Sequence, residues 1–418
     1  MTLTMGRETA ATTAPAARNA PVLVAFTAIT NLADGVLRVA LPLLAVGLTG
    51  SPAQVAAVGF ALTLPWLLVA LHVGVLVDRV DRRRLLSIAN TIRLGAVGAL
   101  LLTLATDTVA MPVLLGAALV VGVTDVIAST SLSAIVPSAV RPAQLTRTNA
   151  WVTGAETVTN EFAGPALGGL LVGLGAAVSL GATAVAYGIG ILLTLLLVGG
   201  FKAVRTTRAP ARGSVNADIR EGLRFLRRNR LLWTMTVTIS VLIISWSAWL
   251  ALLPTFATGE LHLSGAAYGL LISTIGAGGL AGVFLAEPLN KLLGRRNTLF
   301  ADLVGTLVMV AIPAIFPHPV LIGVAGFAGG LGGTLWTVTS RTISQQLVPQ
   351  EMYGRYSATA RLISWGTLPL GAGLAGVLAE FVGVRWTFAV LALIVVATFV
   401  PFLRNVTEKK LPPEPETD

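Results

Sequence analysis

Five ionisable residues lie deep inside long apolar segments of the chain: Asp34, Arg38, Asp125, Glu156 and Glu161. An ionised side chain at the centre of a bilayer costs several kcal/mol, so each one is a functional candidate. Asp34 and Arg38 are four residues apart, which places them on one helix face where they can pair. Because four carboxylates face one arginine, we expect some of them to bind protons. The set predicts proton exchange, with Asp34 as the main site, Arg38 as its counter-ion, and Glu156, Glu161 or Asp125 as a second site.

A structural alternative stays open for this set, in which Asp34 and Arg38 form a structural pair and the other carboxylates line polar cavity walls. The remaining ionisable residues within the apolar segments fall nearer the segment ends, where long side chains reach the interface. We therefore expect structural roles for Glu287, Asp302, Arg341 and Arg361, and a packing role for His72. Arg93 lies at an intermediate depth.

The second half of the chain contributes aromatic residues to the expected ligand contacts. Tryptophan combines a broad apolar surface with one hydrogen-bond donor, which suits a large amphipathic ligand. An interfacial or lipid-facing position is the competing explanation for each ring. The predicted substrate-binding residues are Asn31 and Trp66 from the first half and Trp246, Trp249, Trp336 and Trp365 from the second half.

The composition indicates that these residues lie within a membrane. Of the 418 residues 55% are hydrophobic and 11% are charged, with a mean hydropathy of +0.82, whereas charged residues make up about 25% of soluble domains. The net charge of +10 is concentrated in short loops, which indicates topology rather than nucleic-acid binding. Without cysteines, and with three dispersed histidines, no metal site is expected. No phosphate-binding loop is present, so ATP is not the expected energy source.

Twelve apolar segments are long enough to span a bilayer as helices. Lys and Arg are concentrated in alternate loops, which predicts that both termini face the cytoplasm. The predicted fold is therefore an all-α polytopic membrane protein. The segments are 21–48, 54–77, 84–106, 110–136, 147–174, 177–200, 231–257, 265–289, 297–316, 319–346, 356–380 and 386–403.

The polar regions divide the chain into five parts. We expect disordered cytoplasmic tails at 1–20 and 404–418, a six-helix bundle at 21–201, a cytoplasmic linker at 202–230 and a second six-helix bundle at 231–403. Within the linker, Ile219, Leu223 and Leu226 have helical spacing with arginines opposite. This pattern predicts an amphipathic helix that contacts anionic lipid headgroups.

The two halves repeat one another. Ile135-Val136-Pro137 matches Leu347-Val348-Pro349, and Gly168 and Gly175 precede Gly376 and Gly383 by the same 208 residues. A pair of six-helix bundles related by duplication places a substrate path between repeats near the bilayer midplane.

Two motifs carry a resemblance to a known family. The loop Gly74-Val75-Leu76-Val77-Asp78-Arg79-Val80-Asp81-Arg82-Arg83-Arg84 resembles the hairpin signature of the major facilitator superfamily, with Asp81 in place of its second glycine. The segment Gly164-Pro165-Ala166-Leu167-Gly168-Gly169 resembles the signature of its antiporters. The resemblance implies the major facilitator fold of twelve helices in two pseudo-symmetric bundles. It also implies a gating role for Gly74, Asp78, Arg79, Arg82 and Arg83, and a bendable, closely packed helix at Gly164, Pro165, Gly168 and Gly169.

Further short matches, such as Asn31-Leu32-Ala33-Asp34-Gly35 and Glu221-Gly222-Leu223-Arg224-Phe225-Leu226, resemble the branch of macrolide-efflux and siderophore-export proteins. Unlike many drug antiporters, the fourth segment has no arginine and offers Asp125 instead.

The resemblance implies a monomeric, non-enzymatic transporter of the bacterial inner membrane. It would export an antibiotic-like or siderophore-like molecule in exchange for protons, without a cofactor, in contact with membrane lipids. The alternatives are a lipid or lysolipid flippase, a nutrient importer or symporter, and an inactive scaffold.

Overall fold

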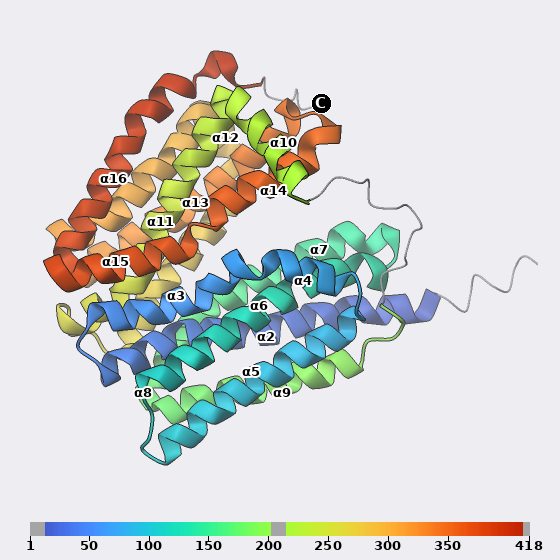
Figure 1. Ribbon diagram of the computed structural model, residues 1–418, viewed down its shortest axis with the longest axis vertical. Coiled ribbons are helices and arrows are strands. Elements are labelled where there is room, and N and C mark those ends of the chain that lie inside the picture. The colour runs from blue at the N-terminus through green and yellow to red at the C-terminus, as the bar shows by residue number, and fades with distance from the viewer. Residues whose placement is uncertain (1–12, 202–214, 413–418) are drawn as a thin grey trace, which may run out of the picture. The chain divides into compact units, whose positions relative to one another are not determined.

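A computed structural model describes residues 13–201 and 215–412, and these residues are almost entirely helical (Figure 1). Among them, nine helices are long and apolar enough to cross a membrane. These nine and the shorter helices, apart from those at 215–228 and 408–410, coincide with the predicted apolar segments, which is consistent with the expected twelve spans. The all-α polytopic fold predicted from the sequence is confirmed.

The first half contains eight α-helices and one π-helix. They are α2 (Thr13–Leu48), α3 (Pro52–Leu68), α4 (Ala70–Val77), α5 (Arg82–Ala105), α6 (Met111–Ala139), α7 (Pro142–Glu156), η1 (Thr157–Ala163), α8 (Gly164–Leu174) and α9 (Ala176–Leu195). Helices α5, α6 and α9 run side by side, and α2 packs against α9 and α8 (Figure 1).

The second half begins with the linker helix. Its elements are α10 (Val215–Arg228), α11 (Arg230–Gly259), α12 (Gly265–Ile315), α13 (Pro319–Leu347), α14 (Gln350–Trp365), α15 (Leu368–Val382), α16 (Val384–Asn405) and the 3₁₀ turn η2 (Glu408–Lys410). Helix α12 joins two predicted segments, and it turns at Gly294, whose φ of +79° is left-handed. Glycine adopts this conformation without the clash that a Cβ would cause.

The chain forms two compact units, but their boundaries differ from the predicted bundles. Within the described residues, unit 1 comprises 13–48, 64–201 and 265–269, and unit 2 comprises 49–63, 215–264 and 270–412. The start of α3 is thus grouped with the second half, and the start of α12 with the first. Close glycine contacts explain the second exchange, because a Cβ on Gly169 of α8 would lie only 2.7 Å from the Gly269 Cα.

Two predicted disordered tails contain ordered residues. Helix α2 begins at Thr13, so the part of the first tail from residue 13 onwards is helical, as its alanine-rich sequence favours. In the second tail, Val406 is fully buried and Arg295 donates a 3.0 Å hydrogen bond to the Pro412 carbonyl. Residues 1–12 and 413–418 of these predictions lie outside the described residues.

The apolar face of the linker helix α10 packs against another helix of the same chain. Gly222 fits against the backbone of Arg355, and Phe225 meets Tyr356 edge-on at 6.3 Å between ring centroids. Arg355 also bonds Glu221 at 3.0 Å. The amphipathic helix is confirmed, but its apolar side packs on α14, which leaves the arginine side for other contacts. The linker residues 202–214 lie outside the described part of the chain.

The charged hairpin between α4 and α5 is tied to the end of α9. The Asp81 carboxylate caps α5 by accepting bonds from the backbone N–H groups of Arg83 and Arg84, at 3.0 and 3.2 Å, and also from Phe201 at 3.2 Å. The Arg83 guanidinium donates to the carbonyls of Leu195 and Leu197. The aspartate that stands at the motif's second glycine position therefore serves as the N-cap of α5.

The second half repeats this arrangement. Arg296 donates to the Leu403 carbonyl, and Leu403 follows Leu195 by the same 208 residues that separate the sequence repeats. In both halves an arginine just after the turn thus satisfies a carbonyl near a helix end, where intrahelical partners are missing.

Replacing Asp81 by alanine is expected to lower the free energy of unfolding by about 1–2 kcal/mol, because α5 loses its cap. Asp78→Ala serves as the control, since Asp78 is exposed and its side chain forms no hydrogen bond or ion pair with the described residues. Thermal unfolding of the two purified variants in one detergent checks this. Equal melting temperatures would show that the Asp81 contacts do not stabilise the fold.

Candidate ion-coupling site

A buried arginine lies between two carboxylates in unit 1. Arg93 of α5 places one terminal nitrogen, Nη1, 3.1 Å from Asp34 Oδ2, on α2. Its other terminal nitrogen, Nη2, lies 3.1 Å from Asp125 Oδ1, on α6. The Arg93 side chain is 1% exposed, the Asp34 side chain 14% and the Asp125 side chain 38%. One guanidinium therefore links three helices and faces two negative charges, of which Asp125 is the more accessible.

Neutral side chains complete the hydrogen bonds of this group. The Tyr187 hydroxyl, from α9, donates to Asp34 Oδ1 at 2.6 Å, and its ring lies 5.5 Å from the Arg93 guanidinium carbon. Trp66 donates to Asp125 Oδ2 at 3.1 Å, and Arg93 Nε donates to the Thr124 hydroxyl at 3.2 Å. All four oxygens of the two carboxylates thus accept a bond. We call Asp34, Trp66, Arg93, Thr124, Asp125 and Tyr187 the Arg93 network.

Close helix packing holds α2 in place. A Cβ on Gly164 would lie 2.7 Å from the Gly35 Cα, and a Cβ on Gly168 would lie 3.0 Å from the Val36 Cα. Gly35 directly follows Asp34, so the glycines of the antiporter-like segment fix the helix that carries the carboxylate. Pro165 is buried in the first turn of α8, which directly continues η1, so its missing N–H removes one hydrogen bond from a continuous helix.

The structure gives Asp34 a different partner from the expected Arg38. Arg38 is exposed and forms no ion pair with Asp34, whose partner is Arg93. A spacing of four residues allows a pair but does not require one, and Arg93 is buried, so it has the greater need of a counter-charge.

The other predicted carboxylates differ in their relation to the network. Asp125 joins it, whereas Glu156 and Glu161 are exposed and make no hydrogen bond to its members. Glu161 belongs to η1, a π-helical stretch, and π-helical turns often accompany functional sites.

The predicted substrate contacts fall into three groups. Trp66 belongs to the Arg93 network, and Asn31 accepts a 3.1 Å bond from Asn160 of η1. Trp249 and Trp336 are 0% and 3% exposed, so both rings belong to the packed interior of unit 2. Trp246 is half-buried, and Trp365 is 55% exposed. In this structure a ligand can therefore contact Trp246 and Trp365, but not the rings of Trp249 and Trp336.

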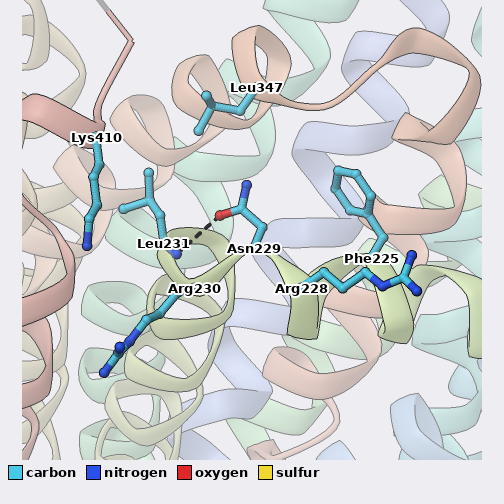
Figure 2. A pocket seen from close by; sticks show the side chains of 7 residues that line it. All are labelled: Phe225, Arg228, Asn229, Arg230, Leu231, Leu347 and Lys410. Atoms are coloured by element: carbon cyan, nitrogen blue, oxygen red, sulfur yellow. Dashed lines mark hydrogen bonds between the residues drawn. The ribbon is translucent and has the colours of Figure 1, made fainter.

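A cavity of about 520 Å³ lies where α10 meets α11 in unit 2 (Figure 2). Its lining contains none of the predicted site residues. The residues are Phe225, Arg228, Asn229, Arg230, Leu231, Leu347 and Lys410. Figure 2 shows Arg228 and Arg230 pointing in different directions, and the Asn229 side chain caps α11 through Leu231 and Leu232, so the cavity does not present a convergent set of donors.

The sequence alone does not identify Arg93, Tyr187 or Asp302 as functional candidates. Arg93 was placed at intermediate depth, although a charged residue in the third apolar segment already requires a carboxylate partner from another helix. Tyr187 carried no signal, because a tyrosine in an apolar span is compatible with packing alone. Asp302 was assigned a structural role near a segment end, but it is 1% exposed.

The family model for transmembrane secretion effectors of the major facilitator superfamily matches residues 10–414. The chain belongs to this family. This protein is therefore a multi-pass membrane transporter and not an enzyme, as the sequence predicted.

Relatives of known name support the same assignment. The multidrug efflux pump Tap of Mycobacterium tuberculosis is 30% identical over 403 residues, which cover 92% of this chain and 93% of the pump. The Tap pump of Mycolicibacterium fortuitum is 28% identical, with 92% and 96% covered.

Solved structures share the fold of this chain. The nucleoside transporter NupG, crystallised as a point mutant, superposes with a TM-score of 0.74 at 13% identity, covering 93% of this chain and 100% of NupG. A bacterial homologue of the iron transporter ferroportin, in its inward-facing state, gives a TM-score of 0.71 at 16% identity, with 94% and 99% covered. The predicted major facilitator fold is confirmed.

Proposed function

We propose that this protein exports a hydrophobic or amphipathic small molecule, such as an antibiotic or siderophore, in exchange for protons. The observation that carries the proposal is the single buried Arg93 held by two carboxylates from different helices. If both carboxylates are ionised the group has a net negative charge, so one proton restores neutrality in a dry environment. The similarity to the Tap multidrug efflux pumps supports the direction of transport and the substrate class.

In this mechanism the proton exchange is assigned to Asp125 rather than to Asp34, the main site predicted from the sequence, because the Asp125 side chain is the more exposed of the two. A proton on Asp125 weakens its bond to Arg93, and Arg93 then pairs with Asp34 alone. The link between α5 and α6 is loosened, whereas the link between α5 and α2 remains. Proton binding thereby biases the unit between two arrangements of its helices, which is what alternating access requires.

Other residues take supporting roles in the proposal. Trp246 and Trp365 contact the apolar substrate, and the exposed Glu156 and Glu161 attract cationic ones. The hairpin residues Gly74, Asp78, Arg79, Arg82 and Arg83 gate the cytoplasmic side. The protein lies in the bacterial inner membrane with both termini in the cytoplasm, and it works as a monomer without a cofactor, driven by the proton motive force.

Proton release tests the mechanism. Purified protein in weak buffer is mixed with a macrolide, a siderophore or a lipophilic cation, and the pH change is recorded. We expect release on binding by the wild type, and loss of release in Asp125→Asn and Asp34→Asn while substrate still binds. Glu260→Gln is the control, because Glu260 is exposed and belongs neither to the network nor to the proposed substrate contacts, and it should release protons as the wild type does.

Two other results would contradict the proposal. Full proton release by both Asp variants would overturn the assignment of the network. Binding without release in the wild type would overturn proton antiport and favour uniport or lipid handling.

A further inference from the structure

Unit 2 contains a carboxylate that is buried without a counter-charge. Asp302 lies on α12, eight residues after the turn at Gly294, which corresponds to about 12 Å along the helix axis. The residue is 1% exposed. Its Oδ2 atom has no hydrogen-bond partner, and Asp302 belongs to none of the salt bridges among the described residues. The expected structural role near a segment end does not account for such a site.

Residues of three helices contact this carboxylate or are linked to it by hydrogen bonds. From α13, Gly332 approaches so closely that a Cβ there would lie 2.7 Å from the Asp302 Cα and 3.0 Å from its Oδ1. One turn further along α12, Thr306 donates to Asp302 Oδ1 at 3.4 Å. From α11, Trp246 donates to the Thr306 hydroxyl at 3.3 Å. Trp246, Thr306 and Asp302 thus form a continuous hydrogen-bonded chain.

The charged residues of the surrounding helices lie toward the helix ends. On α12 itself Arg296 precedes Asp302 by six residues, about 9 Å along the axis. On α13, Arg341 follows Gly332 by nine residues, about 13 Å along that helix. The remaining charges are Arg230 at the start of α11, Arg385 and Arg404 at the two ends of α16, and Glu287, Lys291 and Arg295 before Asp302 on α12. An ionised Asp302 would therefore be desolvated without compensation, which is costly.

We propose that Asp302 is a proton-binding site of unit 2, separate from the Arg93 network and linked through Thr306 to Trp246. A proton needs one oxygen only, whereas a bound metal cation needs several oxygen ligands. Among the described residues, the side chain that forms a hydrogen bond to Asp302 is that of Thr306. No group of three or more His, Cys, Asp or Glu side chains that could hold a metal ion occurs in the described chain. A neutral carboxyl removes the cost of burial. The use of this site during transport rests on the proposed function, but proton binding itself does not.

Infrared difference spectroscopy of the full-length protein in liposomes tests the site without any substrate. A protonated carboxyl has a C=O stretching band that a carboxylate lacks, so spectra recorded across a pH series follow its titration. We expect one component of the pH-dependent carboxyl absorption of the wild type to disappear in Asp302→Asn, whereas the components from other carboxyl groups, including those of the Arg93 network, remain. Glu287→Gln is the control, because Glu287 lies on the same helix with its side chain 75% exposed and paired to Lys291, and it should retain the band.

Two further variants keep the test decisive if Asp302→Asn does not fold. Thr306→Val removes the hydrogen bond to Oδ1, and Asp302→Glu moves the carboxyl by one methylene group. Both are expected to shift the band in frequency or in its pH midpoint. Identical spectra for the wild type and Asp302→Asn, or an unshifted band in both of the other variants, would overturn the proposal. Because no substrate is present, failure here leaves the antiport proposal intact, and failure of proton release with substrate leaves this site intact.

Discussion

Replacing Arg93 by methionine is expected to destabilise unit 1 by about 3–5 kcal/mol and to abolish proton-coupled export. Removal of one member of a buried ion pair leaves an uncompensated buried charge, which accounts for a loss of this size. In this protein the substitution leaves two carboxylates, Asp34 and Asp125, without their common partner. Thermal unfolding in detergent and transport in liposomes with an imposed pH gradient measure the two effects.

Arg38→Met is the matched control for Arg93→Met. Arg38 lies on the same helix as Asp34 but is exposed and unpaired with it, so its loss should change the melting temperature little. Arg93→Lys should also lose coupling, because an ammonium group is a point charge and cannot bridge two carboxylates as a planar guanidinium does. Wild-type coupling in Arg93→Met would contradict the role assigned to the network.

A neutral triple variant separates folding from coupling. Asp34→Asn, Arg93→Met and Asp125→Asn together remove every charge of the site, so much of the lost stability should return while proton coupling stays absent. If stability did not return, the cost of Arg93→Met would come from lost packing rather than from unpaired carboxylates.

Substituting Gly164 by valine is expected to prevent correct packing of unit 1. A Cβ at this position would lie 2.5 Å from the Thr159 carbonyl oxygen and 2.7 Å from the Gly35 Cα, both of which are backbone atoms that cannot rotate away. Overpacking of this kind costs about 1–3 kcal/mol, and more where backbones must separate. The yield of monodisperse protein in size-exclusion chromatography, together with its melting temperature, reports the loss.

The same helix contains the control for this substitution. No atom would lie within 4 Å of a Cβ on Gly173, so Gly173→Val should yield stable protein. Equal yields for the two variants would show that α8 can move away from α2, against the close contact seen here.

The sequence predicted those features that depend on local signals. Long apolar segments specify membrane-spanning helices regardless of their partners, and repeated motifs revealed the two halves. The antiporter-like glycines could also be interpreted locally, because small residues permit close helix contact. These signals were sufficient for the fold, for the roles of Asp34 and Asp125 as members of a buried site, and for the amphipathic helix α10.

Such local signals do not predict contact partners that come from other helices. Arg38 was paired with Asp34 by spacing alone, whereas the structure supplies Arg93 from a helix 59 residues away in sequence. The burial of Asp302 could not be predicted for the same reason, since it depends on Gly332 of α13 rather than on the distance of Asp302 from a segment end. The units also exchange parts of α3 and α12, which no pattern within either helix could reveal.

The π-helical stretch η1 has a consequence for the comparison of relatives. Bonding from residue i to i+5 holds one more residue in a turn than the α-helix does. A relative with an unbroken α-helix in this segment is expected to have one residue fewer between the positions of Glu156 and Gly164. An alignment must then place a gap inside the helix so that Gly164 remains opposite Gly35, or every later position of that segment will be assigned to the wrong helix face.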